Sequence, residues 1–179
     1  GTLNLTGTIT ADNTVTQNSI NVVSNSLTSD ASNLIGAISN AGTLNLTGGT
    51  LVSTIGNYNN TPGTTYIKGD VTANANISGN NVNLTSGTLT LNQGTFNGIS
   101  TFTADGGHLN TQNTLTQQTS LGAVTLNSDM NWAMEANLTT TGASVLGTAD
   151  NLEANANPSL NNNNIIINNI LLTSASTKR

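Results

Sequence analysis

Acidic side chains are the residues of this chain best suited to chemistry, because it has eight of them, one histidine, three cations and no cysteine. The densest acidic group is Asp129, Glu135, Asp150 and Glu153. Paired carboxyl groups in a cleft could cleave glycosidic bonds, and acids beside a basic residue could serve a polysaccharide lyase. The acids are scattered, however, and the only interior cation is Lys68. We therefore expect the four acids to lie on a solvated face or loop.

Two smaller sets of residues could attract metal ions. His108 is the only histidine and has only Asp105 near it, whereas a metal site needs several ligands and a general base needs an orienting group. Asp12, Asp70 and Asp105 could attract Ca²⁺ if they stacked at related corners. Calcium-binding β-rolls, however, carry a Gly-rich nonapeptide with an Asp in nearly every turn, and that pattern is absent. We expect a solvated histidine, turn-forming aspartates, and no catalytic, cofactor-binding or metal-ligating set.

Composition restricts the class of protein further. Only 6% of the residues are charged, the formal net charge is -5, and the only strong cations are Lys68, Lys178 and Arg179. Such a chain has no basic patch for nucleic acid or anionic lipid. The lack of cysteine fits an extracellular bacterial protein exported without oxidative help. No signal peptide opens the chain and no apolar run approaches the ~18 residues of a membrane span, so we expect an excised segment of a longer protein.

Glycosylation sequons are also present but carry no prediction. The N-x-[ST] pattern occurs at Asn4, Asn45, Asn76, Asn83 and Asn137. A chain this rich in Asn and Thr produces such sites by chance, and several lie on expected strands. We assign them no role.

A short repeat is the main signal for the fold. The heptapeptide GTLNLTG stands at residues 1–7 and again at 42–48, and a looser copy, GTLTLNQ, stands at 87–93. Leu3 and Leu5 alternate with polar residues, as in a half-buried strand. A lone strand of this length cannot bury its apolar face, but a coil that stacks turn upon turn can. Similar alternating runs begin at positions 1, 19, 42, 64, 87, 107, 123, 143 and 165.

The sequence therefore predicts an all-β protein, a right-handed parallel β-helix of about nine rungs of roughly 20 residues each. A β-sandwich is the alternative fold, although it does not need identical residues at equivalent positions. Asn residues should tolerate corners and form hydrogen-bonded ladders between rungs. The glycines expected at corners with positive φ are Gly7, Gly48, Gly49, Gly94 and Gly107. The predicted inward stack is Leu3, Val22, Leu44, Ile67, Leu89, Leu109, Val124 and Val145.

Residues 1–179 are expected to form a single solenoid segment with two departures from regularity. Residues 57–66, with Pro62, should form a loop, because Pro cannot donate to an interior ladder. Residues 127–164 should be less regular, and within them DMNWAMEANL at 129–138 reads as a short helix or a packed insertion. The run NNNNIIINNILL at 161–172 should begin as a loop and end as the most apolar strand. Because neither end looks capped, we expect the rod to pair end to end with like copies or with neighbouring rungs.

The stretches GTLNLTGGTLVSTIGN and NNVNLTSGTLTLNQGTF resemble the repeats of bacterial autotransporter passenger domains. The Asn/Thr-rich stretch TTYIKGDVTANANISGNNVNL is similar to rickettsial surface antigens of the outer-membrane-protein A and B type. The resemblance covers most of residues 1–126. Two-partner-secreted haemagglutinin-like adhesins and phage tail-spike stems have repeats of closely similar residue composition.

The resemblance implies a secreted, non-catalytic stalk or coat-layer segment on the outer surface of a Gram-negative cell. Its implied partners are like copies, a host-cell surface receptor or a glycan. The alternative functions are a polysaccharide-processing β-helix of the lyase or glycosidase kind and a tail-spike stem.

Overall fold

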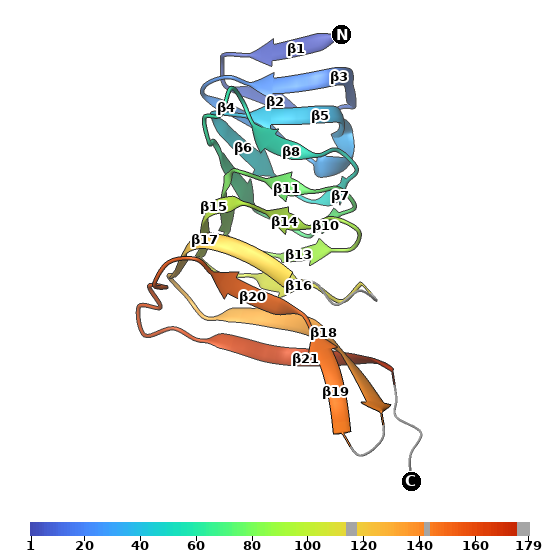
Figure 1. The fold of residues 1–179 in the computed structure, drawn as a ribbon. Helices are drawn as coiled ribbons and strands as arrows, with labels where there is room; N and C mark the ends of the chain where they lie inside the picture. Colours follow the sequence, from blue (N-terminus) through green and yellow to red (C-terminus); the bar gives the residue numbers. More distant parts are fainter. Residues whose placement is uncertain (114–117, 142–143, 175–179) are drawn as a thin grey trace.

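The chain coils into a parallel β-helix with three sides. The structure is a computed structural model, and it describes residues 1–113, 118–141 and 144–174. Each regular turn contributes one short strand to each of three sheets, and each strand pairs in parallel with the equivalent strands of the turns before and after it. The N-terminus and β21 (Ile165–Ser174) lie at opposite ends of the coil (Figure 1). The predicted fold class is confirmed.

The first sheet has six strands, and its members lie one below another along the coil (Figure 1). They are β1 (Thr2–Leu5), β3 (Val15–Val22), β5 (Leu34–Asn40), β8 (Ile55–Asn57), β11 (Ile77–Ser78) and β14 (Phe96–Asn97).

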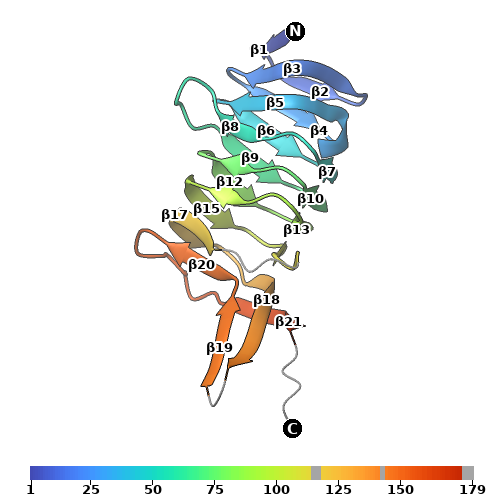
Figure 2. The same ribbon diagram turned by 45° about the vertical axis from the view of Figure 1, so that its right-hand side comes forward.

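The second sheet has eight strands, all of which are labelled in Figure 2. They are β2 (Ile9–Ala11), β4 (Ser26–Ser29), β6 (Thr43–Leu46), β9 (Thr64–Ile67), β12 (Asn81–Leu84), β15 (Ile99–Ala104), β17 (Gln118–Leu126) and β20 (Asn151–Ala154). At about 4.8 Å between neighbours, eight strands span roughly 34 Å.

The third sheet completes the turn, and one short 3₁₀ helix, η1 (Ala31–Asn33), packs beside its first strand. Its strands are β7 (Gly49–Leu51), β10 (Val71–Ala73), β13 (Thr88–Leu91), β16 (His108–Asn110), β18 (Met130–Thr141) and β19 (Ser144–Ala149), with β21 paired to β18.

Columns of mostly apolar side chains line the interior and continue to its ends, because strand residues that share a register point the same way and stack turn upon turn. On the first sheet the column is Leu3, Ile20, Ile38, Ile55, Ile77 and Phe96. On the second sheet it is Ile9, Leu27, Leu44, Thr65, Val82, Phe102 and Val124. On the third sheet it is Val71, Leu89, Leu109, Trp132 and Ile167.

The single stack predicted from the sequence is therefore wrong, although most of its members are buried. Val22 belongs to the first sheet, Leu44, Ile67 and Val124 to the second, and only the pair Leu89 and Leu109 lies in direct register. Val145 lies in β19 and pairs antiparallel with Thr140.

The coil makes about six turns, fewer than the nine predicted. The run that begins at residue 143 is not a rung: β19 folds back antiparallel on β18, and the two form a hairpin at the end opposite the N-terminus (Figure 1). The last turn lacks a complete set of three strands. Between β20 and β21, the only described strand pairing is an isolated parallel bridge from Thr125 to Ser159.

Residues 129–138 form neither a helix nor a separate insertion. Met130, Trp132 and Met134 of β18 are buried and point into the core, and their register with β16 and β21 continues the third sheet. The only Trp and both Met residues suggested an interruption, but the alternation of buried and outward residues with a period of two decides the conformation.

The two predicted loops are found where turns are needed. Residues 58–63 form a turn between β8 and β9 with an antiparallel bridge from Tyr58 to Thr61, and Asn59 and Asn60 have φ of 49° and 59°. Asn161 and Asn162 likewise adopt positive φ before β21 begins. These Asn residues fit the αL conformation that non-glycine residues otherwise avoid.

Only part of the glycine prediction is correct. Gly48, Gly49 and Gly107 have φ of 156°, 86° and 81°, but Gly7 and Gly94 are not among the positive-φ residues. Gly94 is required for a different reason: a Cβ there would lie 2.2 Å from the carbonyl oxygen of Ala75 in the preceding turn. Close stacking of two turns, and not the corner conformation, excludes a side chain at this position.

Candidate functional site

The four acids of the densest group do not share one environment. Asp129 is exposed and its carboxylate accepts a hydrogen bond from the backbone N–H of Asn164 at 2.7 Å. Glu153 is exposed on β20. Glu135 and Asp150, by contrast, are 0% and 5% exposed. The expectation of a solvated face or loop holds for Asp129 and Glu153 and is wrong for Glu135 and Asp150.

Glu135 and Asp150 belong to a buried polar cluster at the base of the hairpin. The Asp150 carboxylate accepts from the Thr111 hydroxyl at 2.6 Å and from the backbone N–H of Glu135 at 2.9 Å. The Thr111 hydroxyl oxygen accepts from the Trp132 indole N–H at 3.1 Å. The Glu135 carboxylate accepts from the backbone N–H of Asn113 at 3.1 Å. These hydrogen bonds hold β18, the segment after β16 and the end of the hairpin together.

This cluster was missed in the sequence because its members are far apart along the chain. Thr111 and Asp150 are separated by 39 residues, and nothing in the spacing of the acids indicates that β19 folds back on β18. The one available signal was that Glu135 lies among Trp132 and two Met residues, in the most apolar surroundings of any acid in the chain.

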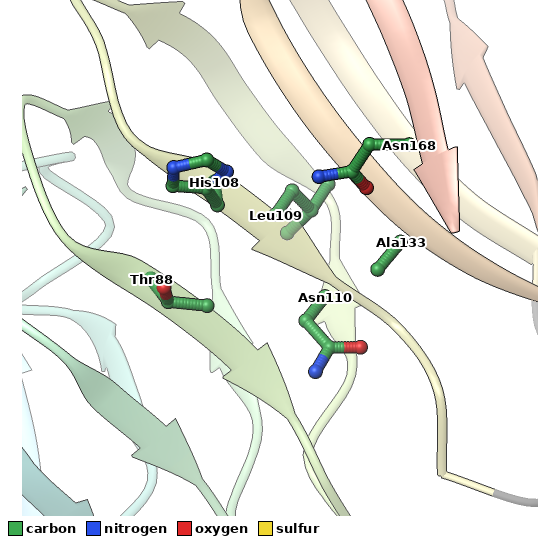
Figure 3. A pocket seen from close by; sticks show the side chains of 6 residues that line it. All are labelled: Thr88, His108, Leu109, Asn110, Ala133 and Asn168. Carbon is green, nitrogen blue, oxygen red and sulfur yellow. The ribbon is translucent and has the colours of Figure 1, made fainter.

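His108 is exposed, as expected, and lines a shallow hollow on the outer face of the third sheet (Figure 3). The hollow has a volume of about 260 Å³ and is lined by Thr88, His108, Leu109, Asn110, Ala133 and Asn168. Ala133 contributes apolar surface, and Thr88, His108, Asn110 and Asn168 contribute hydrogen-bonding groups. The Leu109 side chain itself is buried in the core. Asn168 comes from β21, so the sequence could not place it beside His108.

The three corner aspartates each follow a strand of the second sheet, but they do not stack. Asp12 follows β2, Asp70 follows β9 and Asp105 follows β15, with at least one other strand of that sheet between each pair. Asp70 accepts from the backbone N–H of Thr88 at 2.8 Å, and Asp105 accepts from the side-chain amide of Asn127. Both carboxylates tie one turn to the next. Within the described part of the chain, no three potential metal ligands come together.

The end of the coil formed by the last turn is the most apolar surface of the described residues. Among the described residues, ten large hydrophobic side chains are exposed, and seven of these ten lie between residues 160 and 172. Their exposed fractions run from 41% for Ile165 to 56% for Leu172. Behind them lies an apolar cavity of about 230 Å³, whose lining includes Phe102, Met130 and Ile165. The sequence predicted the apolar strand but gave no sign of the cavity.

Comparison of the chain with protein-family models, with curated proteins and with solved structures gives no significant match. Among the described residues, no helix has the length and apolar character needed to cross a membrane.

Proposed function

We propose that this chain is a segment of a secreted stalk or coat layer on the surface of a bacterial cell, with a mechanical and adhesive role and no catalysis. The observation that carries the proposal is the parallel pairing of short strands, turn after turn, along three sides of one coil. Each turn contacts only its neighbours, so the coil can be lengthened by adding turns without changing the existing ones. Such an architecture suits a spacer between a cell and its surroundings.

Hydrogen bonds between the side chains of successive turns support a rigid exterior that needs few charges. The Asn21 side-chain amide donates to Asn4 at 2.7 Å, and Asn92 donates to Asn74 at 2.9 Å. The Thr101 hydroxyl donates to Asn81 at 2.9 Å. These pairs are the ladders expected from the sequence, and they connect turns without ionised groups. Little charge repulsion then opposes the packing of one rod against another.

Adhesion also needs a surface that can hold a ligand, and the hollow of Figure 3 offers one on the outer face of the third sheet. Amide, hydroxyl and imidazole groups around a small apolar floor can hydrogen-bond the hydroxyls of a neutral sugar while its C–H face packs below. A glycan is therefore the first partner to test. His108→Ala and Asn168→Ala should each weaken the binding of any glycan that the protein selects from an array. If His108→Ala leaves the binding unchanged, the glycan binds at another place on the protein.

Surface display is tested on intact cells of the bacterium that makes the protein. Antibodies raised against the folded chain should label unpermeabilised cells, and brief protease treatment of those cells should remove the label. Labelling that requires permeabilisation would show that the protein is inside the cell and would overturn the proposal. A periplasmic marker that stays unlabelled in the same cells is the control for membrane integrity.

A further inference from the structure

The exposed end of the coil has a free strand edge in addition to its apolar side chains. β21 pairs in parallel with β18, and no other described strand pairs with its opposite edge. Free edges with apolar side chains are sites at which another strand adds. Most edge strands of natural proteins carry charges or Pro that discourage this, whereas Ile165–Leu172 contains only Ile, Leu and Asn.

The apolar side chains of β21 emerge on both faces of the sheet. Register with β18 places Ile165, Ile167, Ile170 and Leu172 beside Met130, Trp132, Met134 and Ala136, so these four lie on the face of the sheet that faces the core, although each is 41–56% exposed. Ile166 and Leu171 lie beside Asn131 and Glu135 and point to the other face. A parallel-paired strand that is apolar on both faces is typical of an interior position, flanked by strands on both sides.

A β-bulge makes this pattern symmetric about the middle of the strand. The register with β18 slips between Ile167 and Asn169, which leaves Asn168 as the extra residue. Figure 3 shows the Asn168 side chain at the outer hollow with His108. Without the slip, Ile165 and Leu172 would point to opposite faces, because seven positions separate them. With the slip, Ile165, Ile167, Ile170 and Leu172 point inward and Ile166 and Leu171 point outward. Asn168 and Asn169 lie between the two halves of this pattern.

We propose that a second copy of this chain closes the end, with the two β21 strands paired antiparallel about a two-fold axis between Asn168 and Asn169. A two-fold axis perpendicular to a sheet preserves its faces, so each residue must meet a residue that points the same way. The bulged strand meets this condition along its length. Ile165 lies opposite Leu172 of the second copy, Ile166 opposite Leu171, and Ile167 opposite Ile170.

The arrangement joins two coils tail to tail and covers the exposed side chains with like residues. Leu172 of the second copy lies beside Ile165, which lines the terminal cavity. The opposite end of the coil fits this surface less well, since Ile9, at 37%, is its only exposed large hydrophobic residue. This inference specifies the end-to-end contact of the proposed stalk, but it concerns the chain alone and does not require display on a cell.

Single cysteines test the pairing directly, because the chain has none of its own. Directly opposite Cα atoms in an antiparallel pair lie about 4.5–5.5 Å apart, within the range that a disulfide spans. Oxidation of a mixture of Ile165→Cys and Leu172→Cys chains, distinguished by tags of different length, should yield the mixed dimer. Each variant alone should not cross-link, since the two copies of residue 165 would be roughly 23 Å apart. Efficient cross-linking of Ile165→Cys with itself would mean parallel pairing and would overturn the proposal.

Sedimentation velocity of the 179-residue chain supplies the second test. The chain should sediment as a dimer that dissociates on dilution, and Ile166→Lys should shift it to monomer by placing a cation at the interface while sparing the core. Ile35→Lys, on β5, is the matched control, because Ile35 is 40% exposed and Ile166 is 42% exposed. Leu171→Lys repeats the test if Ile166→Lys loses its β-sheet circular dichroism spectrum. A monomer at all concentrations, oligomers larger than the dimer, or a dimer unaffected by both lysines would contradict the tail-to-tail pairing.

Discussion

The two copies of GTLNLTG have identical sequences and occupy different places in the molecule. The first copy forms β1, at the open edge of the first sheet, and the second forms β6, in the second sheet between β4 and β9. Leu3 is only partly buried, whereas Leu44, its counterpart, is fully buried. The local sequence thus determines that a strand forms and which side chains share a face. Position in the stack determines how deeply they are buried.

The spacing of the copies explains why they lie on different sheets. In the first sheet, Leu3 and Ile38 lie two turns apart and are separated by 35 positions. The second copy of the heptapeptide, however, begins 41 positions after the first. The extra six residues are about one strand and one corner, so the second copy falls on the next sheet. The third copy, at 87–93, forms β13 and advances by one sheet again.

The largest difference between the copies should appear when each leucine is truncated. Leu44→Ala should lower the free energy of unfolding by about 3 kcal/mol, because it leaves a cavity between fully buried neighbours. Leu3→Ala should cost about 1 kcal/mol, since its side chain is already partly in water. Urea denaturation of both variants measures the difference. Equal costs would mean that burial at the two copies is the same.

The first glycine of each copy gives the next largest contrast. A Cβ at Gly42 would lie 2.7 Å from the backbone oxygen of Asn25, so Gly42→Ala should destabilise by about 2 kcal/mol through overpacking. At Gly1 the nearest atom is the side-chain oxygen of Gln17, at 2.8 Å, and that side chain can move away. Gly1→Ala should therefore change stability by less than about 0.5 kcal/mol. Thermal melts of the two variants should separate clearly, and a mild Gly42→Ala would show that the turns are packed less closely.

A substitution in the column that holds Leu44 should stabilise the protein. Thr65 stacks directly on Leu44, is 0% exposed, and its hydroxyl has no hydrogen-bond partner among the described residues. Thr65→Val replaces that hydroxyl by a methyl group of similar size and should raise the free energy of unfolding by about 1 kcal/mol. A loss of stability in the same urea titration would indicate that the hydroxyl is hydrogen-bonded.

The smallest effects are expected at the outward asparagines of the two copies. Asn4 accepts a hydrogen bond from Asn21, so Asn4→Asp keeps the acceptor and should change stability by less than about 0.5 kcal/mol. Asn45 donates to the Thr28 hydroxyl at 3.1 Å and is 8% exposed, so Asn45→Asp removes the donor and should cost about 1 kcal/mol. A larger cost at Asn4 than at Asn45 would reverse these assignments of donor and acceptor.

The sequence was sufficient to predict the fold class because alternation and corner residues are local features. Leu3 and Leu5 alternate, and Asn59 and Asn60 turn the chain, in ways that need no knowledge of distant residues. The stacking order was not predictable, since it depends on the length of every turn between two strands. The repeat misled us here: aligning the heptapeptides put Leu3 and Leu44 in one column, whereas Leu3 stacks on Ile20.

The same reasoning separates what could be predicted of the candidate sites. The exposure of His108 and the apolar character of β21 follow from nearby residues. The burial of Glu135 and Asp150 depends on the hairpin of β18 and β19, and the hollow beside His108 depends on Asn168, which β21 brings from 60 positions away. Sites assembled from separate turns become visible only when the register is known.

Disulfide formation between chosen turns tests the register most directly. Thr28 and Asn45 are register partners on β4 and β6, where neighbouring Cα atoms lie about 4.8 Å apart, so the Thr28→Cys/Asn45→Cys double variant should close a disulfide without loss of structure. Asn4→Cys/Asn45→Cys places cysteines at equivalent positions of the two heptapeptides, which lie on different sheets, and should remain reduced under the same mild oxidation. Mass spectrometry of the two oxidised proteins should show an intramolecular disulfide in the first and free thiols in the second. A disulfide that forms between residues 4 and 45 and not between 28 and 45 would show that the identical segments stack on each other, and would contradict the three-sided coil described here.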